Sequence, residues 1–173
     1  MNYTNAMIVP ESCLATPSLE EVLVALELRL ELEDAIAKLP LTRALEQCSL
    51  FSQGNNLPDI TEFVRYELDG YSSSQPPDSR SVQLIYFDRG GQAIAGLSQY
   101  SSYPLVIGVR KLEMHLKNGL TLKLPSQILT FLSQIAGREV DTGHVSPVQI
   151  SSSLENIRHF TIRRLTNHNI NKL

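Results

Sequence analysis

The chain has 173 residues, of which 42% are hydrophobic and 19% are charged, and its net charge at pH 7 is −3. A chain of this length suits one globular domain with a substantial core, and the small negative charge provides no general attraction to nucleic acids or anionic membranes. The sequence lacks the basic region and apolar run of a signal peptide, and no stretch approaches the ~20 apolar residues that cross a bilayer. We therefore expect a cytoplasmic protein without a membrane partner.

The predicted helical domain begins at Ser18. Residues 1–17 show no sustained hydrophobic period, and we expect them to form a flexible arm before a single domain over 18–173. Ser18 and Glu21 form a capping box, which is typical of a helix start. The segment up to Lys38 is rich in Leu, Ala and Glu, which favour helices, and a proline then ends it.

Helix 18–38 carries two apolar rows. The first follows a 3.6-residue period and comprises Leu19, Val22, Leu23, Leu26, Leu30 and Ala35. The second comprises Leu28, Leu32 and Ile36. Two rows are wider than the stripe that faces one core. The helix is therefore predicted to contact neighbours on two sides, with the second row forming an interface to a helix of another chain.

Two further helices are predicted, one from residue 42 to 52 and one that starts after Pro58-Asp59 and runs to residue 68. Gly54-Asn55-Asn56 stops the first, and Gly70 follows the second as its C-terminal cap. Because the connections between these helices are short, they favour antiparallel neighbours, as in a helical hairpin or small bundle.

The middle of the chain indicates a small β element. A polar loop is predicted at 72–80. The β-branched and aromatic residues at 82–87 predict a strand that ends in a turn. A second strand is predicted at 120–124, where leucines alternate with polar residues. These two segments are expected to form a short antiparallel strand pair.

The remaining segments are predominantly helical by their spacing. Residues 93–102 show little order, whereas helical periods occur at 104–115, 125–137 and 147–165, with a polar loop through Gly143 before the last of them. Each of these three segments begins with a proline, which is favoured in the first turn of a helix. The expected fold class is mainly α with a small β element (α+β).

Three stretches contain motifs that occur in the same order in one known family. The first contains Arg43-Ala44-Leu45 and then the element Glu67-Leu68-Asp69-Gly70-Tyr71 at the end of a helix pair. The second contains Pro77 to Arg80, followed by Pro104 and a helical segment ending in Leu112-Glu113. The third is the closing helix at 151–165, in which an arginine precedes apolar residues.

In these motifs, over residues 41–165, the chain resembles the AbiTii-type domain of bacterial abortive-infection (anti-phage defence) proteins. The chain departs from the family pattern at Ser79, where the family usually has a tyrosine. The resemblance implies a role in anti-phage defence, and it supplies no catalytic residues.

One polar group coincides with these motifs and comprises Arg65, Glu67, Asp69, Tyr71 and Arg80. In a functional interpretation these residues bind a ligand or a partner segment. In a structural interpretation Gly70 caps the helix, Tyr71 packs back on it, and Arg80 pairs with Glu67 or Asp69. Both interpretations remain open from the sequence.

The sequence contains no complete catalytic constellation. Its four histidines lack the i, i+4 spacing of a helical zinc site, and Cys13 and Cys48 stand alone, so that neither a metal nor a cofactor is expected. A basic cluster near the C-terminus, comprising Arg158, Arg163 and Arg164, fits either a nucleic-acid contact or a solvated helix end.

These observations favour a non-enzymatic protein-interaction or oligomerisation module, whose partner is a second copy of the chain or another defence protein. Two alternatives remain. One is a toxin-like effector that acts on nucleic acid through the helix at 158–164, and the other is a sensor of infection that binds a small ligand near Tyr71 and Arg80.

Overall fold

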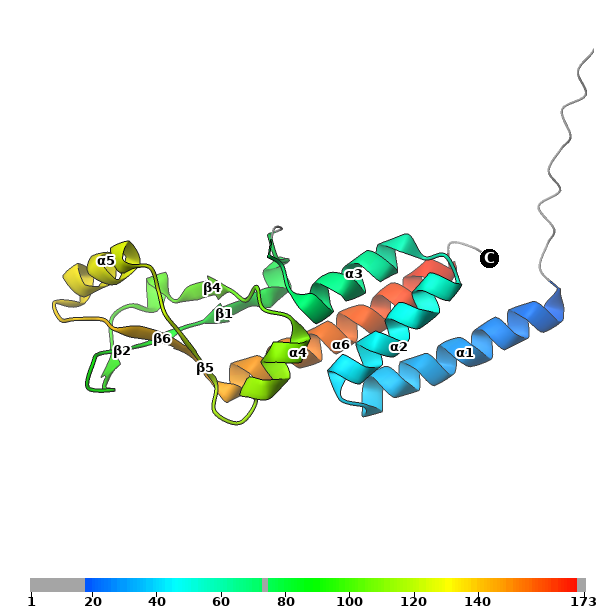
Figure 1. Cartoon of the computed structure of the whole chain (residues 1–173), viewed down its shortest axis with the longest axis horizontal. Helices are drawn as coiled ribbons and strands as arrows, with labels where there is room; N and C mark the ends of the chain where they lie inside the picture. The colour runs from blue at the N-terminus through cyan, green and yellow to red at the C-terminus, as the bar shows by residue number, and fades with distance from the viewer. Residues whose placement is uncertain (1–17, 73–74, 171–173) are drawn as a thin grey trace, which may run out of the picture.

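The computed structural model describes residues 18–72 and 75–170 (Figure 1), so the predicted arm at 1–17 lies outside the described residues. The first three helices confirm the sequence prediction and are α1 (Leu19–Lys38), α2 (Leu41–Gly54) and α3 (Pro58–Asp69). The capping box at the start of α1 is also confirmed. The Ser18 backbone N–H donates to Glu21 Oε2 over 2.8 Å, and the Glu21 N–H donates to Ser18 Oγ over 3.2 Å.

The last helix, α6 (Pro147–Ile170), completes the predicted helical bundle. It extends from the β region into the bundle, where it lies against α1 and α3, while α2 packs against α1 and α3 (Figure 1). The bundle core is made of side chains that are almost fully buried, namely Ile36, Leu41, Leu45, Val64, Ile157 and Leu165. The molecule is therefore elongated, with helices at one end and short strands at the other.

The β region contains more strands than the sequence indicates. Within residues 18–72 and 75–170 there are six strands, all paired antiparallel, in two small sheets. The two-stranded sheet consists of β1 (Ser81–Gln83) and β4 (Ser102–Pro104). The second sheet has the order β3-β2-β6-β5, formed by β2 (Ile85–Phe87), β3 (Ala93–Ile94), β5 (Leu120–Leu122) and β6 (Thr142–Val145).

The predicted strand at 82–87 is divided between these two sheets. At the division, the Leu84 backbone N–H donates to the Ser101 carbonyl oxygen over 2.8 Å, and the Leu84 side chain is buried. The prediction of a loop through Gly143 is wrong, because β6 pairs with β2 on one side and β5 on the other. The expected pairing of 82–87 with 120–124 is wrong as well, since β6 lies between β2 and β5. Two neighbouring strands thus order a segment of low intrinsic strand propensity.

The helix predicted at 104–115 begins later than expected. Pro104 belongs to β4, and the helical part is limited to α4 (Val109–Leu112) and a 3-10 turn, η3 (Glu113–His115). The intervening backbone is held extended by two hydrogen bonds of 2.9 and 2.8 Å, from Leu105 N–H to the Arg80 carbonyl and from Tyr71 N–H to the Val106 carbonyl. The predictions at 120–124 and 125–137 are confirmed by β5 and by α5 (Ser126–Ala136).

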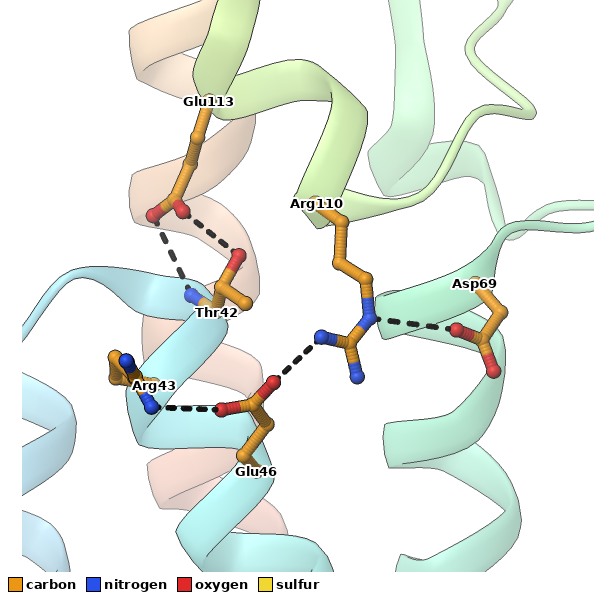
Figure 2. A network of polar contacts seen from close by, with 6 residues as sticks. All are labelled: Thr42, Arg43, Glu46, Asp69, Arg110 and Glu113. Carbon is orange, nitrogen blue, oxygen red and sulfur yellow. Dashed lines mark hydrogen bonds and ion pairs between the residues drawn. The ribbon is translucent and has the colours of Figure 1, made fainter.

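The late start of α4 places Glu113 against the N-terminus of α2 (Figure 2). Pro40 precedes α2 and provides no side-chain cap. Instead, Glu113 Oε1 accepts from the Leu41 and Thr42 backbone N–H groups over 2.7 and 3.3 Å, and Thr42 Oγ1 donates to Glu113 Oε2 over 2.7 Å. A residue 71 positions later in the chain thus satisfies the open N–H groups of this helix.

Replacing Glu113 should therefore destabilise α2. We expect Glu113→Ala to lower the free energy of unfolding by about 1–2 kcal/mol, the usual cost of losing an N-cap, and Glu113→Gln to lose less because its amide oxygen still accepts hydrogen bonds. Urea unfolding measures both changes. Met114→Ala is the matched control, since Met114 is exposed beside Glu113. An equal effect of Glu113→Ala and Met114→Ala would contradict the capping role.

Candidate functional site

Three of the five predicted site residues form one buried cluster. Glu67 lies in the last turn of α3, Tyr71 follows the helix directly after Gly70, and Arg80 reaches both from a 3-10 turn, η1 (Asp78–Arg80). Tyr71 Oη donates to Glu67 Oε1 over 2.6 Å, and Arg80 Nε lies 3.6 Å from Glu67 Oε2. The exposed fraction is 0% for Arg80, 2% for Glu67 and 8% for Tyr71. We call this group the buried triad.

Burial dominates the electrostatics of the buried triad. Removal from water raises the pKa of Glu67 above its ordinary value, although the Arg80 charge and the Tyr71 hydrogen bond oppose this rise. Burial likewise lowers the pKa of Arg80, against the attraction of Glu67, and raises that of Tyr71, where the bond to Glu67 acts in the same direction. The groups are therefore costly to bury and depend on one another as partners.

Arg80 also connects the buried triad to the segment before α4. Its Nη2 donates to the Ile107 carbonyl oxygen over 2.6 Å, and its guanidinium carbon lies 5.5 Å from the centre of the Tyr71 ring. Beside these contacts Gly70 pairs with Ile107 in an isolated β-bridge. A single arginine thus contacts the end of the helical bundle and the chain that leads from the β region.

Two glycines allow the backbones to approach at this point. Gly70 has a φ of +100°, and a Cβ placed there would lie 2.6 Å from the Val106 carbonyl oxygen. A Cβ on Gly108 would lie 2.2 Å from the Leu68 carbonyl oxygen. Since real side chains cannot occupy such distances, the element Glu67-Leu68-Asp69-Gly70-Tyr71 forms a structural joint between the two halves of the molecule.

Asp69 and Arg65 lie apart from the buried triad. Asp69 is two residues from Glu67, so its side chain projects from a different side of α3, where Asp69 Oδ1 lies 3.5 Å from Arg110 Nε (Figure 2). Arg65 is exposed, with its Nη2 4.0 Å from Glu62 Oε1 and its guanidinium over the Tyr66 ring. The five predicted residues therefore do not form one site.

A second polar network, drawn in Figure 2, joins α2, α3 and α4. Arg110 is at its centre, because its Nη1 lies 2.5 Å from Glu46 Oε1 while its Nε faces Asp69. Arg43 Nη1 lies 3.7 Å from the other oxygen of Glu46. The arginine is about half exposed, so these ion pairs are screened and contribute little individually. Arg110 of α4 thus contacts both α2 and α3, whereas Arg43 and Glu46 both lie on α2.

The three C-terminal arginines point in different directions, since five and six residues separate Arg163 and Arg164 from Arg158. The Arg158 guanidinium donates to the Ile36 carbonyl oxygen, and its Nε lies 3.2 Å from Glu155 Oε1. The Arg164 guanidinium lies 4.5 Å from the centre of the Phe63 ring. Arg163 is exposed. Two of the three cations are thus engaged within the chain.

Other chemistry is limited in the part of the chain that the structure describes. No group of three or more His, Cys, Asp and Glu side chains gathers there as metal ligands would. His144 Nδ1 lies 3.2 Å from Thr121 Oγ1. Burial raises the pKa of the Cys48 thiol to about 12, which keeps the thiol protonated and unreactive. Cys13 lies outside the described residues.

The residues predicted for an interface fall in two environments. Leu32 and Ile36 pack inside the chain's own core, whereas Leu28 is 49% exposed. Four leucines of the other row are more available, since Leu19, Leu23, Leu26 and Leu30 are between 44% and 77% exposed. We call these four residues the α1 leucine row. Nothing in α2, α3 or α6 covers it, because α1 meets the bundle through a different side.

Breaking the buried ion pair should destabilise the protein strongly. Arg80→Met leaves the Glu67 carboxylate buried without a cation, and we expect a loss of about 3–5 kcal/mol. The double variant Glu67→Met/Arg80→Met should recover part of this loss, because both charges are then absent. Chemical unfolding measures the free energy of unfolding of the parent and of each variant, with Arg65→Met, a change at an exposed arginine, as control. If Arg80→Met and Arg65→Met cost the same, the ion pair is not structural.

The raised pKa of Glu67 makes stability depend on pH. Between the unfolded-state pKa, near 4.5, and the higher folded-state pKa, the native state binds more protons than the unfolded state. The contribution of Glu67 is therefore fully present below pH 4.5 and is lost as the pH rises through the folded pKa. Glu67→Gln removes this dependence, so its stability relative to the parent should increase from pH 4.5 to pH 8. If the free energies of unfolding of Glu67→Gln and the parent, measured with urea, change with pH in parallel, the raised pKa of Glu67 is contradicted.

Comparisons with known proteins identify a family for this chain. Neither the curated proteins nor the solved structures contain a significant match to the chain. The model of the AbiTii family matches residues 26–165, which is most of the chain, and includes the buried triad, Arg110 and Glu113. The match also extends beyond the range 41–165 indicated by the motifs, into α1. The chain therefore belongs to the AbiTii family and is a protein related to abortive-infection defence.

Proposed function

We propose that the chain is a non-enzymatic module that associates with copies of itself in an abortive-infection system. The observation that carries this proposal is the α1 leucine row, a set of exposed apolar side chains on a helix that projects from the bundle (Figure 1). The polar residues that the family motifs contain support the proposal indirectly, because they are engaged in internal contacts.

The C-terminal half of α1 anchors the helix to the bundle. Leu32 and Ile36 are buried there, and Arg29 Nε lies 3.0 Å from Glu33 Oε1. Thr166 of α6 donates from Oγ1 to the same Glu33 oxygen over 3.4 Å. The N-terminal half extends beyond the ends of α2, α3 and α6 (Figure 1). The helix is thus held at one end and available at the other.

The leucine spacing suits contact with another helix. Leu19, Leu23, Leu26 and Leu30 follow the 4-3-4 spacing of positions d, a, d and a in a coiled coil. Burying one leucine fully stabilises by about 1.5–3 kcal/mol. Association would bury these four exposed leucines and release this free energy, so the exposed row favours association.

A toxin-like effector that acts on nucleic acid has less support. Arg158 and Arg164 are engaged with Ile36, Glu155 and Phe63, so the predicted basic cluster is not one open surface. A sensor that binds a small ligand also has less support at the buried triad, because Glu67 and Arg80 are closed to solvent. A steep salt dependence of RNA or DNA binding would favour the effector instead.

The proposal is tested by the solution mass of the protein. We expect light scattering to show species larger than one 19.3 kDa chain, and a single-chain mass for the variant Leu23→Glu/Leu30→Glu. Charges at these exposed positions oppose association and leave the core intact. By contrast, a charge at Leu32 would enter the core and unfold the bundle, so it is not a useful test.

The matched control is Leu50→Glu, which alters an exposed leucine of α2 outside the α1 leucine row. It should leave the mass unchanged, and circular dichroism should show the same helical content in all variants. A parent protein that is a single chain at every concentration would refute the proposal.

A further inference from the structure

A second apolar face lies at the other end of the molecule, on α5 (Figure 1). Ile128, Phe131 and Ile135 are 41–46% exposed and follow the i, i+3, i+7 spacing of one helix face. The adjoining side of α5 holds the helix in place through Leu132, which is 1% exposed. Tyr100 packs edge-on against Phe131, with ring centres 5.3 Å apart, and widens this surface. We call Ile128, Phe131, Ile135 and Tyr100 the α5 face.

We propose that the α5 face of one copy binds the α1 leucine row of a second copy, so that the copies join head to tail. This inference rests on the proposed self-association and specifies which surfaces meet. The two surfaces belong to opposite ends of an elongated molecule (Figure 1). A contact between two different surfaces leaves one of each free at the ends, so that association continues into open chains.

The two surfaces are of comparable length. At a rise of 1.5 Å per residue, the α1 leucine row spans about 16 Å from Leu19 to Leu30, and the α5 stripe spans about 10 Å from Ile128 to Ile135. Both are ridges of large apolar side chains on a single helix, which is the arrangement that packs ridge into groove. Such a contact is smaller than a standard interface of about 800 Å² per partner, so we expect it to be weak and concentration-dependent.

Charge favours this pairing over a contact between two α1 helices. The α1 leucine row is bordered by an acidic row at seven-residue spacing, Glu20, Glu27 and Asp34. An antiparallel pair of α1 helices would place these acidic rows against each other. In a parallel pair the acidic row of one helix would face Arg29 of the other. Arg29 is already paired within its own helix, because its Nε lies 3.0 Å from Glu33 Oε1.

The sequence of α5 contains no charged residue, so it presents no repulsion to the acidic row. The exposed Lys123 lies before its N-terminus, whereas after its C-terminus Arg138 is bound to Asp88 and is followed by the exposed Glu139. An acidic apolar helix therefore meets no like charge along α5 itself and one exposed cation, Lys123, before its N-terminus. This complementarity identifies a second copy of the chain as the partner of the α5 face.

Mixing two differently blocked variants tests the proposal. Leu23→Glu/Leu30→Glu removes the α1 leucine row, and Phe131→Glu removes the α5 face. Each variant alone should be a single chain. An equimolar mixture should contain a species with the mass of two chains, because one variant keeps its α5 face and the other keeps its α1 leucine row. Met114→Glu changes an exposed apolar residue outside both surfaces and should associate like the parent protein.

The outcomes separate this inference from the proposed function. If the parent is always a single chain, both fail. If Leu23→Glu/Leu30→Glu is a single chain while Phe131→Glu associates like the parent, the α5 inference fails and self-association through α1 stands. Two single-chain variants that do not combine would also overturn the inference. Ile135→Glu provides a second α5 variant, and circular dichroism verifies that both remain folded.

Discussion

The ion pair between Arg80 and Glu67 is the constraint on which the arrangement of the molecule depends. Both side chains are almost fully buried, and charges removed from water are costly unless their partners are in place. The partners come from separate parts of the chain, because Tyr71 donates to Glu67 and the Ile107 carbonyl accepts from Arg80. The end of α3, the turn η1 and the segment before α4 must therefore meet at one point.

This joint determines features at some distance from it. The backbone from Leu105 to Gly108 is held extended by Arg80 and Tyr71 and cannot begin a helix, so α4 starts at Val109. That start places Arg110 between α2 and α3, and it places Glu113 over the N-terminus of α2 (Figure 2). The residues that resemble the family motifs thus build the frame of the molecule, and their contacts are internal.

The surfaces available to other molecules lie away from this frame. Its polar residues are paired within the chain, whereas exposed apolar side chains gather at the two ends of the molecule, on α1 and α5 (Figure 1). In the part of the chain described here, no helix combines the length and apolar composition needed to cross a membrane. Exposed apolar surface is typical of protein contacts. The proposed role in self-association therefore rests on the exposed apolar side chains of α1 and α5, and the paired polar residues maintain the fold.

The sequence by itself determined the helices, because their signals are local. The capping box at Ser18, the apolar periodicity of α1 and α5, and the glycine after α3 all act within a few residues. Tertiary structure alone decided which row of α1 is buried, where the strand at Leu84 divides, that 142–145 forms β6, and that Glu113 caps α2. These features arise between segments far apart in the chain, and a local pattern records the propensity of a segment but not the surface that it meets.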